Sequence, residues 1–571
     1  MDAKAAFDAA MNFWRTPAGV QRRYVELPSG LLHYRIALPP AAVAAQRVPL
    51  LCIHLTPNSG RVYARFLAEM GRDRIAIAAD TPGFGLSPLR AGEISIDGHA
   101  AALGELVDHL AREHGFSTFD VMGYHTGSKI ALALARLRAE QVRRVVLVSA
   151  PVYTADELAA QRATLGAGGE VPRRDGSHLR ERWQGHWAFK DPAADEWFVQ
   201  REVAEGLRAA QHAWRTYHAA FAVQHAEVLP QTAQPVLLLC PNDDLAVPTR
   251  RAAKLLRHGR FVELPQWAHG FLDMHTGEAA ALVREFLDAA SSAPANGATI
   301  RAQDAATRRA ASRAHYHDGP FGLLHYRRAA CEATTAPPLY LLHMSPNSSR
   351  IFDALLPEMA RDREVIAIDT PGFGESYAPP SPPSIDDYAK CVAHLARGLG
   401  HAQIDVLGYH TGAMTAIALA VAEPDLVRRV VQISCPVFTA EEREALRTEY
   451  RGRVPRADGE HLVDSWLNLQ KFYGPNVPLE VLARNFAEGL LGGPAAPWGH
   501  RAAFDYDLAA VLPQVQQSVL IVNPEDDLVA QSPRGLALLK NARMLELPGQ
   551  SHGFIDVMAA DFGRALRDFL G

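Results

Sequence analysis

The 571-residue chain has few cysteines, no long apolar run and no excess of charge of one sign. Its five cysteines include no C-x-x-C pair, and Cys52, Cys240 and Cys435 lie in apolar, strand-like runs. This usage predicts reduced, mostly buried thiols rather than a disulfide framework. No apolar run reaches the roughly 18 residues that cross a bilayer. The start, MDAKAAFDAAMNFW, also lacks a basic stretch followed by an apolar core. These absences predict a cytoplasmic protein outside the membrane.

The charges exclude some classes of partner. The 58 Lys and Arg residues are intermixed with 63 Asp and Glu residues, for a net charge of -5. Without a basic stripe, neither nucleic acid nor an anionic membrane surface is an expected partner, so we expect a small-molecule substrate. The length is too great for one hydrophobic core and suits two domains.

The second half of the chain repeats the first at an offset of about 290 residues. The matching segments are GLLHYR from Gly30 and Gly322, HLTPNS from His54 with HMSPNS from His343, GYHTG from Gly123 and Gly408, and ELPQWAHGF from Glu263 with ELPGQSHGF from Glu546. A period this long indicates a tandem duplication of a whole domain rather than a solenoid. The expected domains are 1–290 and 313–571, joined by an Ala/Ser/Pro-rich linker, 291–312.

Within each copy, short β-branched runs alternate with longer helical runs. Such alternation predicts an α/β fold with a mainly parallel sheet flanked by helices. The alternation breaks after Pro151 and again after Pro436, where segments rich in aromatic residues intervene before the next strand. We expect these segments, about 152–230 and 437–513, to form a helical cap over the end of each sheet.

Each GYHTG segment follows an apolar run and precedes an Ala-rich helical run, so each lies where a strand turns into a helix. That is the setting of the G-x-S-x-G nucleophile elbow, except that the central serine is replaced. The residue at this position is His125 in the first copy and His410 in the second.

Taken in order, these motifs make both halves resemble the α/β-hydrolase fold family, with a cap between the sixth and seventh core strands. The resemblance implies a nucleophile, an acid and a histidine in that order along the chain. The residues at the acid position are Asp244 and Asp527, with their neighbours Asp243 and Asp526 as alternatives, and those at the histidine position are His269 and His552.

The resemblance also implies an oxyanion site. Its first donor would be the backbone N–H of Thr126 or Thr411, directly after the elbow. Further N–H groups would come from the loops that contain Leu55 and Thr56 in one half and Met344 and Ser345 in the other. Leu55 and Met344 replace a glycine that many members of the family carry. An alternative interpretation is that these loops are turns held by local side-chain bonds.

Both caps carry the motif D-G-x-H-L-x-x-x-W. Its polar and aromatic members, which are candidates for substrate contact, are His178 and Trp183 in the first cap and His461 and Trp466 in the second. The alternative is a capped helix that buries its tryptophan.

Four interpretations of the elbow histidine remain open. The imidazole is a nucleophile, or it works with the second histidine as a general acid and base. In the third, His125 and His269 bind a metal together with Asp244 or a cap residue. In the fourth, catalysis is lost and the domains act as a binding module. The enzyme interpretations are favoured because each half keeps the acid, the loop histidine and both elbow glycines.

The sequence therefore predicts a hydrolase of a small carbonyl compound, namely an ester, a lactone or the C–C bond of a diketone. A lyase of the same fold and an inactive pseudo-hydrolase are the alternatives. No cofactor is implied. We expect the two halves to pack as an internal pseudo-dimer, and further homo-oligomerisation is left open.

Overall fold

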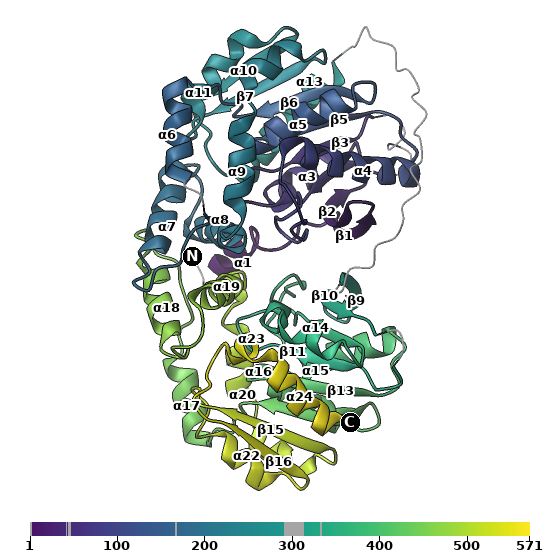
Figure 1. Ribbon diagram of the computed structural model, residues 1–571, viewed down its shortest axis with the longest axis vertical. Coiled ribbons are helices and arrows are strands. Elements are labelled where there is room, and N and C mark those ends of the chain that lie inside the picture. Colours follow the sequence, from purple (N-terminus) through teal and green to yellow (C-terminus); the bar gives the residue numbers. More distant parts are fainter. Residues whose placement is uncertain (1–2, 41–42, 44–46, 166–167, 290–312, 332–333) are drawn as a thin grey trace. The chain divides into compact units, whose positions relative to one another are not determined.

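A computed structural model describes residues 3–40, 43, 47–165, 168–289, 313–331 and 334–571 (Figure 1). The predicted linker, 291–312, lies outside these residues. Within them, no helix combines the length and the apolar character that crossing a bilayer requires. All five cysteines are free and four of them are buried, which confirms the prediction for the thiols.

The chain forms two compact units. The N-terminal unit consists of Thr16–Val171 and Arg182–Ala310, and the C-terminal unit consists of Met1–Arg15, Pro172–Glu181 and Ala311–Gly571. The sequence places both short segments, Met1–Arg15 and Pro172–Glu181, in the first domain. Their contacts instead group both segments with the second half of the chain.

The N-terminal unit is built on an eight-stranded sheet with the order β1-β2-β4-β3-β5-β6-β7-β8. The strands are β1 (Val20–Leu27), β2 (Gly30–Ala37), β3 (Leu50–Ile53), β4 (Ala76–Ala79), β5 (Phe119–Tyr124), β6 (Val142–Val148), β7 (Val236–Pro241) and β8 (Gly259–Leu264). The β1–β2 and β2–β4 pairs are antiparallel, and all other neighbours are parallel. The carboxyl ends of the parallel strands therefore meet at one edge of the sheet.

Helices cover both faces of this sheet. They are α3 (Ala64–Met70), α4 (Ile96–His114), α5 (Thr126–Leu137), α11 (Ala246–Ala252), α12 (Phe271–Met274) and α13 (Thr276–Asp288), with the 3-10 helices η1 (Gly60–Tyr63) and η3 (Ala253–Leu255). Alternate side chains of β3 enter different cores: Leu51 packs with α4 and α5, whereas Leu50 packs with α3 and α13. This two-residue alternation explains why the strands are apolar throughout.

Between β6 and β7, the chain forms the helices of the cap. They are α6 (Ala155–Leu165), α7 (Ser177–Phe189), α8 (Glu196–Ala209), α9 (Ala213–Ala222), α10 (His225–Val228) and η2 (Leu229–Gln231). The cap is tied to the loop after β3 by buried polar contacts. Ser59 Oγ donates to Glu205 Oε2 at 2.7 Å, and Tyr217 Oη donates to the carbonyl oxygen of Thr56 at 2.8 Å.

The C-terminal unit repeats this architecture, with the sheet order β16-β15-β14-β13-β11-β12-β10-β9. Its strands are β9 (Arg313–Gly319), β10 (Gly322–Ala329), β11 (Leu339–Leu342), β12 (Val365–Ile368), β13 (Ile404–Tyr409), β14 (Val427–Ile433), β15 (Ser518–Pro524) and β16 (Ala542–Leu547). Its helices are α1 (Ala3–Met11), α14 (Leu355–Met359), α15 (Ile385–Gly398), α16 (Thr411–Ala422), α17 (Ala440–Glu449), α18 (Glu460–Gln470), α19 (Leu479–Leu490), α20 (Trp498–Asp505), α21 (Leu508–Val511), α22 (Ser532–Leu538), α23 (Phe554–Val557) and α24 (Ala559–Leu570), with η4 (Ser349–Phe352), η5 (Gly493–Ala495) and η6 (Leu512–Gln514). The predicted fold class, two α/β domains in tandem, is confirmed.

Candidate active site

In each unit, the elbow holds a histidine in a strained backbone conformation. His125 lies between β5 and α5 with φ 49° and ψ -114°, and His410 lies between β13 and α16 with φ 48° and ψ -109°. Residues other than glycine seldom adopt positive φ, and the cost is of the order of 1–3 kcal/mol. The conformation places the imidazole at the carboxyl edge of the parallel strands.

The glycines on either side of the elbow have no room for a side chain. A Cβ atom at Gly123 would lie 2.1 Å from the carbonyl oxygen of Gly127, and one at Gly127 would lie 2.2 Å from that of Ile53. At Gly408 and Gly412 the corresponding distances are both 2.1 Å. The strand and the helix therefore meet as closely as only paired glycines allow.

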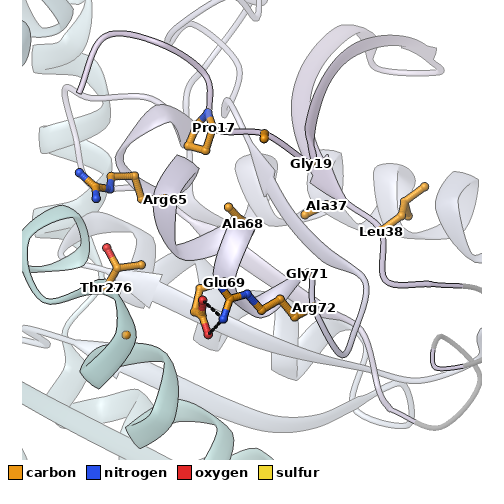
Figure 2. A pocket seen from close by; sticks show the side chains of 12 residues that line it. Pro17, Gly19, Ala37, Leu38, Arg65, Ala68, Glu69, Gly71, Arg72 and Thr276 are labelled. Atoms are coloured by element: carbon orange, nitrogen blue, oxygen red, sulfur yellow. Dashed lines mark hydrogen bonds and ion pairs between the residues drawn. The ribbon is translucent and has the colours of Figure 1, made fainter. Parts of the chain in front are cut away.

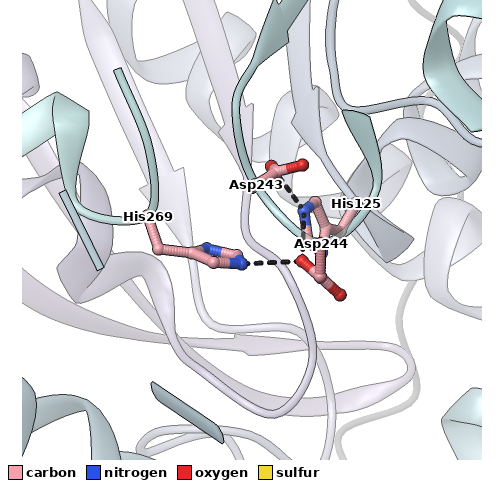
Figure 3. A group of neighbouring side chains, drawn as sticks. All are labelled: His125, Asp243, Asp244 and His269. Atoms are coloured by element: carbon pink, nitrogen blue, oxygen red, sulfur yellow. Dashed lines mark hydrogen bonds and ion pairs between the residues drawn. The ribbon is translucent and has the colours of Figure 1, made fainter. Parts of the chain in front are cut away.

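Four side chains converge beside the first elbow (Figure 3). His125 Nε2 lies 3.0 Å from Asp243 Oδ2, and His269 Nε2 lies 2.9 Å from Asp244 Oδ1. The two pairs are joined, since His125 Nε2 is also 3.9 Å from Asp244 Oδ1 and the imidazole centroids are 5.1 Å apart. The structure thus brings together His125, Asp244 and His269, together with the neighbouring aspartate.

The second unit reproduces this cluster. His410 Nε2 lies 3.0 Å from Asp526 Oδ2, and His552 Nε2 lies 3.0 Å from Asp527 Oδ1. His410 Nε2 is 3.9 Å from Asp527 Oδ1, and the imidazole centroids are 5.2 Å apart. Both aspartates of each unit therefore contact an imidazole, although the sequence presented them as alternatives for one position.

The buried aspartate of each cluster is fixed by a serine that the sequence analysis did not single out. Ser149, directly after β6, donates through Oγ to Asp243 Oδ2 at 2.5 Å, and Ser434 donates to Asp526 Oδ2 at the same distance. Both serines have positive φ, 52° and 59°. A sequence signal existed, since a serine ends the matching VLVS and VQIS segments in both copies.

The loop histidine is held by the cap. The backbone N–H of His269 donates to Phe189 O at 3.0 Å, and the N–H of Asp191 donates to His269 O at 2.6 Å. The buried carboxylate of Asp191 also accepts from the backbone N–H of Ala268 at 3.1 Å. In the C-terminal unit, the N–H of His552 donates to Phe472 O at 3.0 Å. Cap and loop therefore hold each imidazole in place together.

Charge and burial have opposite effects on the pKa values of the residues in these clusters. Burial works to raise the pKa of Asp243, but the imidazole of His125 holds it below its usual range. Burial likewise acts to raise the pKa of Asp244, which the hydrogen bond from His269 keeps well below its usual range. For His269, burial acts to lower the pKa, but the hydrogen bond to Asp244 raises it. The aspartates are therefore ionised at neutral pH.

The orientation of the rings differs from that of a Ser-His-Asp triad, in which the acid binds Nδ1 and leaves Nε2 facing the nucleophile. Here Nε2 of both histidines faces a carboxylate, and Nδ1 of His269 lies 3.2 Å from Tyr124 Oη. The carboxylate of Asp244 lies within reach of both rings, with Oδ1 2.9 Å from His269 Nε2 and 3.9 Å from His125 Nε2.

The predicted oxyanion residues occupy two buried segments. Thr126 and Thr411 begin α5 and α16. Leu55 and Met344 are buried beside His54 and His343, whose Nδ1–H groups each donate to the next carbonyl oxygen at 2.8 Å. Thr56 accepts a bond from the cap, and Ser345 packs so closely on Gly499 that a Cβ there would lie 1.8 Å from its Oγ. Their role as oxyanion donors remains a prediction.

The D-G-x-H-L motifs close local turns. His178 Nδ1 accepts from the backbone N–H of Arg173 at 3.3 Å, and His461 Nδ1 accepts from that of Arg456 at 3.2 Å. Trp183 and Trp466 are fully buried, and Trp466 Nε1 donates to the carbonyl oxygen of Arg174 at 3.1 Å. These contacts match the capped-helix alternative, and substrate contact by the four residues stays a prediction.

An open cavity of about 630 Å³ lies elsewhere in the N-terminal unit (Figure 2). It is lined by residues of α3, the end of β2 and the start of α13, among them Leu38, Arg65 and Thr276. Ala37, at the end of β2, pairs with Ala76 at the start of β4. The cavity therefore lies at the amino edge of the parallel strands, opposite the histidine cluster.

Two cap residues near the clusters were not among the predicted site residues. His186 lies close enough to His269 and Asp244 for their charges to influence it, although burial dominates and lowers its pKa to about 3. In the C-terminal unit, burial and the nearby His410 lower the pKa of His500 to about 4. No motif marks these residues, because the caps differ in sequence at both positions.

Comparisons with known proteins agree with this architecture. Residues 337–465 match a family model described as alpha/beta hydrolase fold, and residues 49–272 match one described as serine aminopeptidase, S33. The chain is 25% identical over 255 residues to 2-(acetamidomethylene)succinate hydrolase of Mesorhizobium japonicum, covering 42% of this chain and 90% of that relative. It is 27% identical over 248 residues to a pimeloyl-(acyl-carrier protein) methyl ester esterase of Neisseria meningitidis, covering 41% and 92%.

Among solved structures, the enol-lactonase of Burkholderia xenovorans is similar, with 22% identity, a TM-score of 0.38 and coverage of 45% of this chain and 99% of that one. The fold, the elbow and the family matches show that the chain belongs to the α/β-hydrolase fold family. Within that family it is an enzyme of the hydrolase class, with two eight-stranded domains in one chain.

Proposed function

We propose that the protein hydrolyses a small, mostly apolar carbonyl compound (an ester, a lactone or the C–C bond of a β-diketone) at a His-Asp-His site in each unit. One observation carries this proposal: two imidazoles, each backed by an ionised aspartate, meet at the edge of the sheet where the elbow normally presents a serine. The names of two relatives, a succinate-derivative hydrolase and a methyl ester esterase, support attack at a carbonyl group.

The cluster suits proton transfer. A carboxylate stabilises the imidazolium form of the histidine that it contacts. With two such pairs side by side, one accepts the proton of an attacking water while the other supplies a proton to the leaving group. The side chain of Asp244 is 42% exposed, so water can reach this carboxylate. No hydroxyl group at the elbow is needed for this chemistry.

Kinetics with a panel of p-nitrophenyl esters, lactones and β-diketones tests the proposal. We compare the wild type with His125→Ala, His410→Ala and the double variant. Each single variant should retain the activity of the other unit, and the double variant should lose at least about 100-fold, as expected when an acid-base group is removed. Activity that survives in the folded double variant would refute the assignment of the clusters as the active sites.

A further inference from the structure

The ligand atoms of each cluster converge on one point. One ligand atom from each of His125, His269, Asp243 and Asp244 lies within 4.8 Å of the other three, and the same holds for His410, His552, Asp526 and Asp527. A four-coordinate ion with ligands at about 2.0–2.1 Å separates neighbouring ligand atoms by about 3.3 Å. The separations in the first cluster, 2.9, 3.0 and 3.9 Å, lie on both sides of that value.

We propose that each unit binds one divalent first-row transition metal ion, such as Zn²⁺, through the two histidine Nε2 atoms and the two aspartate carboxylates. Imidazole combined with carboxylate is a donor set that suits such ions. Two neutral imidazoles and two carboxylates carry a net charge of -2, which a dication balances. This balance matters most for Asp243, whose side chain is 0% exposed, because burying a carboxylate is costly unless its charge is compensated.

The side chains behind the ligands are arranged as in a metal centre, where outer contacts orient the ligands. Ser149 Oγ fixes the Asp243 oxygen that faces His125. Tyr124 Oη contacts Nδ1 of His269, which leaves Nε2 for the ion. In the C-terminal unit, Ser434 takes the same place behind Asp526. These contacts orient His269 and Asp243 in the first site and Asp526 in the second.

One side of each site is open. The side chains of Asp244 and Asp527 are 42% and 41% exposed, whereas those of Asp243 and Asp526 are fully buried. An ion can enter at the exposed carboxylate, and a water molecule can bind on this open side as a fifth ligand. A bound Zn²⁺ lowers the pKa of such a water to about 7.

The catalytic role of the ion rests on the proposed hydrolysis, whereas its binding does not. With the ion bound, both Nε2 atoms are ligands, so a carboxylate of the cluster replaces the imidazoles in proton transfer. In that role, the bound water transfers a proton to a carboxylate of the cluster, and the resulting hydroxide adds to the carbonyl carbon. The bond to the leaving group then breaks, and the leaving group takes up that proton. Water is the only co-reactant, so atoms and charge balance.

Metal titration of the full chain tests the proposal. After treatment with a chelator, Zn²⁺ is titrated by calorimetry, and Co²⁺ by visible absorption, which reports its nitrogen and oxygen ligands. We expect two equivalents per chain, one equivalent in Asp244→Asn or Asp527→Asn, and none in the double variant. His109→Gln, which removes a half-exposed histidine on α4, is the matched control and should keep both equivalents.

The outcomes separate the two proposals. Absence of uptake by the wild type, or two equivalents in the double variant, would overturn the metal site. Full turnover by chelator-treated protein without metal would overturn its catalytic role and leave the proposed hydrolysis intact. Binding of two ions without turnover of any substrate in the panel would leave the metal site intact and count against the proposed hydrolysis. If the double Asp→Asn variant fails to fold, as judged by its melting curve, His269→Gln with His552→Gln replaces it.

Discussion

At both elbows, an imidazole occupies a backbone position that residues other than glycine seldom adopt. The strain at His125 persists because its backbone N–H donates to Val148 O at 3.0 Å and because the glycines at positions 123 and 127 allow strand and helix to meet. The ring is therefore aimed by the backbone rather than by its rotamer alone. Such strain is typical of functional sites, and it is present in both units.

The hydrogen bond from Ser149 to Asp243 can be tested by removing one hydroxyl group. Because its hydroxyl orients Asp243, we expect Ser149→Ala to lower the activity of the N-terminal unit about tenfold, as is usual when a contact behind a functional group is lost. The measurement is kcat/KM in a His410→Ala background. Ser149→Gly removes the same bond but relieves the strain of the positive φ. We therefore expect it to lose as much activity as Ser149→Ala and to be more stable than that variant. An unimpaired Ser149→Ala enzyme would contradict the role of this serine.

Asp80 gives a prediction of pH dependence away from the site. Burial acts to raise its pKa, but Arg35 and His33 hold it well below the ordinary value of 3.8. The stabilisation is therefore complete above about pH 3.8 and is lost as the pH falls through the folded-state pKa. Asp80→Asn removes the carboxylate beside a buried arginine, so we expect the free energy of unfolding to fall by about 3–5 kcal/mol at neutral pH.

Melting temperatures measured across pH check this prediction. The deficit of Asp80→Asn relative to wild type should shrink in acid, where the wild-type carboxylate becomes protonated. Asp369→Asn is the matched control in the C-terminal unit, where the equivalent arginine, Arg327, bonds to Asp353 instead. Asp369→Asn should lower the melting temperature less than Asp80→Asn does. A deficit that does not change with pH would show that the charge of Asp80 contributes little.

For the residues of the site, the sequence predicts their position but not the orientation of their side chains. Motif order was enough to place His125, Asp244 and His269 in one unit, because each follows a strand whose end lies at the same edge. Spacing does not determine which way a ring turns, so the approach of Nε2 to the carboxylates was not predictable. Nor could spacing show that adjacent aspartates, Asp243 and Asp244, each contact a different histidine.

At the scale of elements, the sheet and its flanking helices followed from the alternation of apolar runs, whereas the contacts of the cap did not. Phe189, Lys190 and Asp191 lie at the end of α7 and beside the loop that carries His269, where Lys190 and His269 form an isolated parallel bridge. This contact joins a cap residue to a loop residue about 80 positions further along the chain, and the caps of the two units differ in sequence. No local pattern marks it, because it depends on how the cap folds back onto the sheet.

Asp191 is the element-scale test. Its carboxylate accepts from the backbone N–H groups of Ala193 and Ala268 and lies 3.2 Å from His275 Nε2. We expect Asp191→Ala to destabilise the loop by about 1–3 kcal/mol and to reduce the activity of the N-terminal unit. The equivalent residue of the C-terminal unit is Gly474, so activity measured in a His125→Ala background is the control. Equal losses in both backgrounds would mean that the effect is not local.

At the scale of the molecule, the two sites share their cluster but differ around it. In the N-terminal unit, Arg201 lies between two carboxylates, those of Glu202 and Asp273. In the C-terminal unit, Arg484 pairs with Asp556 and is followed by Asn485. Glu202, whose charge acts on His269, therefore stands where the C-terminal unit has the uncharged Asn485.

This difference predicts different substrate preferences. We expect the N-terminal unit, measured in a His410→Ala background, to turn over anionic substrates more slowly than the C-terminal unit by roughly tenfold, which corresponds to about 1.4 kcal/mol. Glu202→Asn should remove most of that difference. Competition between neutral and anionic esters of equal size provides the measurement. Identical selectivity of the two units would show that the charge of Glu202 does not reach the substrate.

The replacement of serine by histidine at both elbows also has a practical consequence. Reagents that label serine hydrolases capture an activated serine hydroxyl. Neither elbow offers such a hydroxyl, because His125 and His410 stand in its place. A survey based on these reagents would therefore pass over this enzyme, and its substrates have to be sought by following product formation instead.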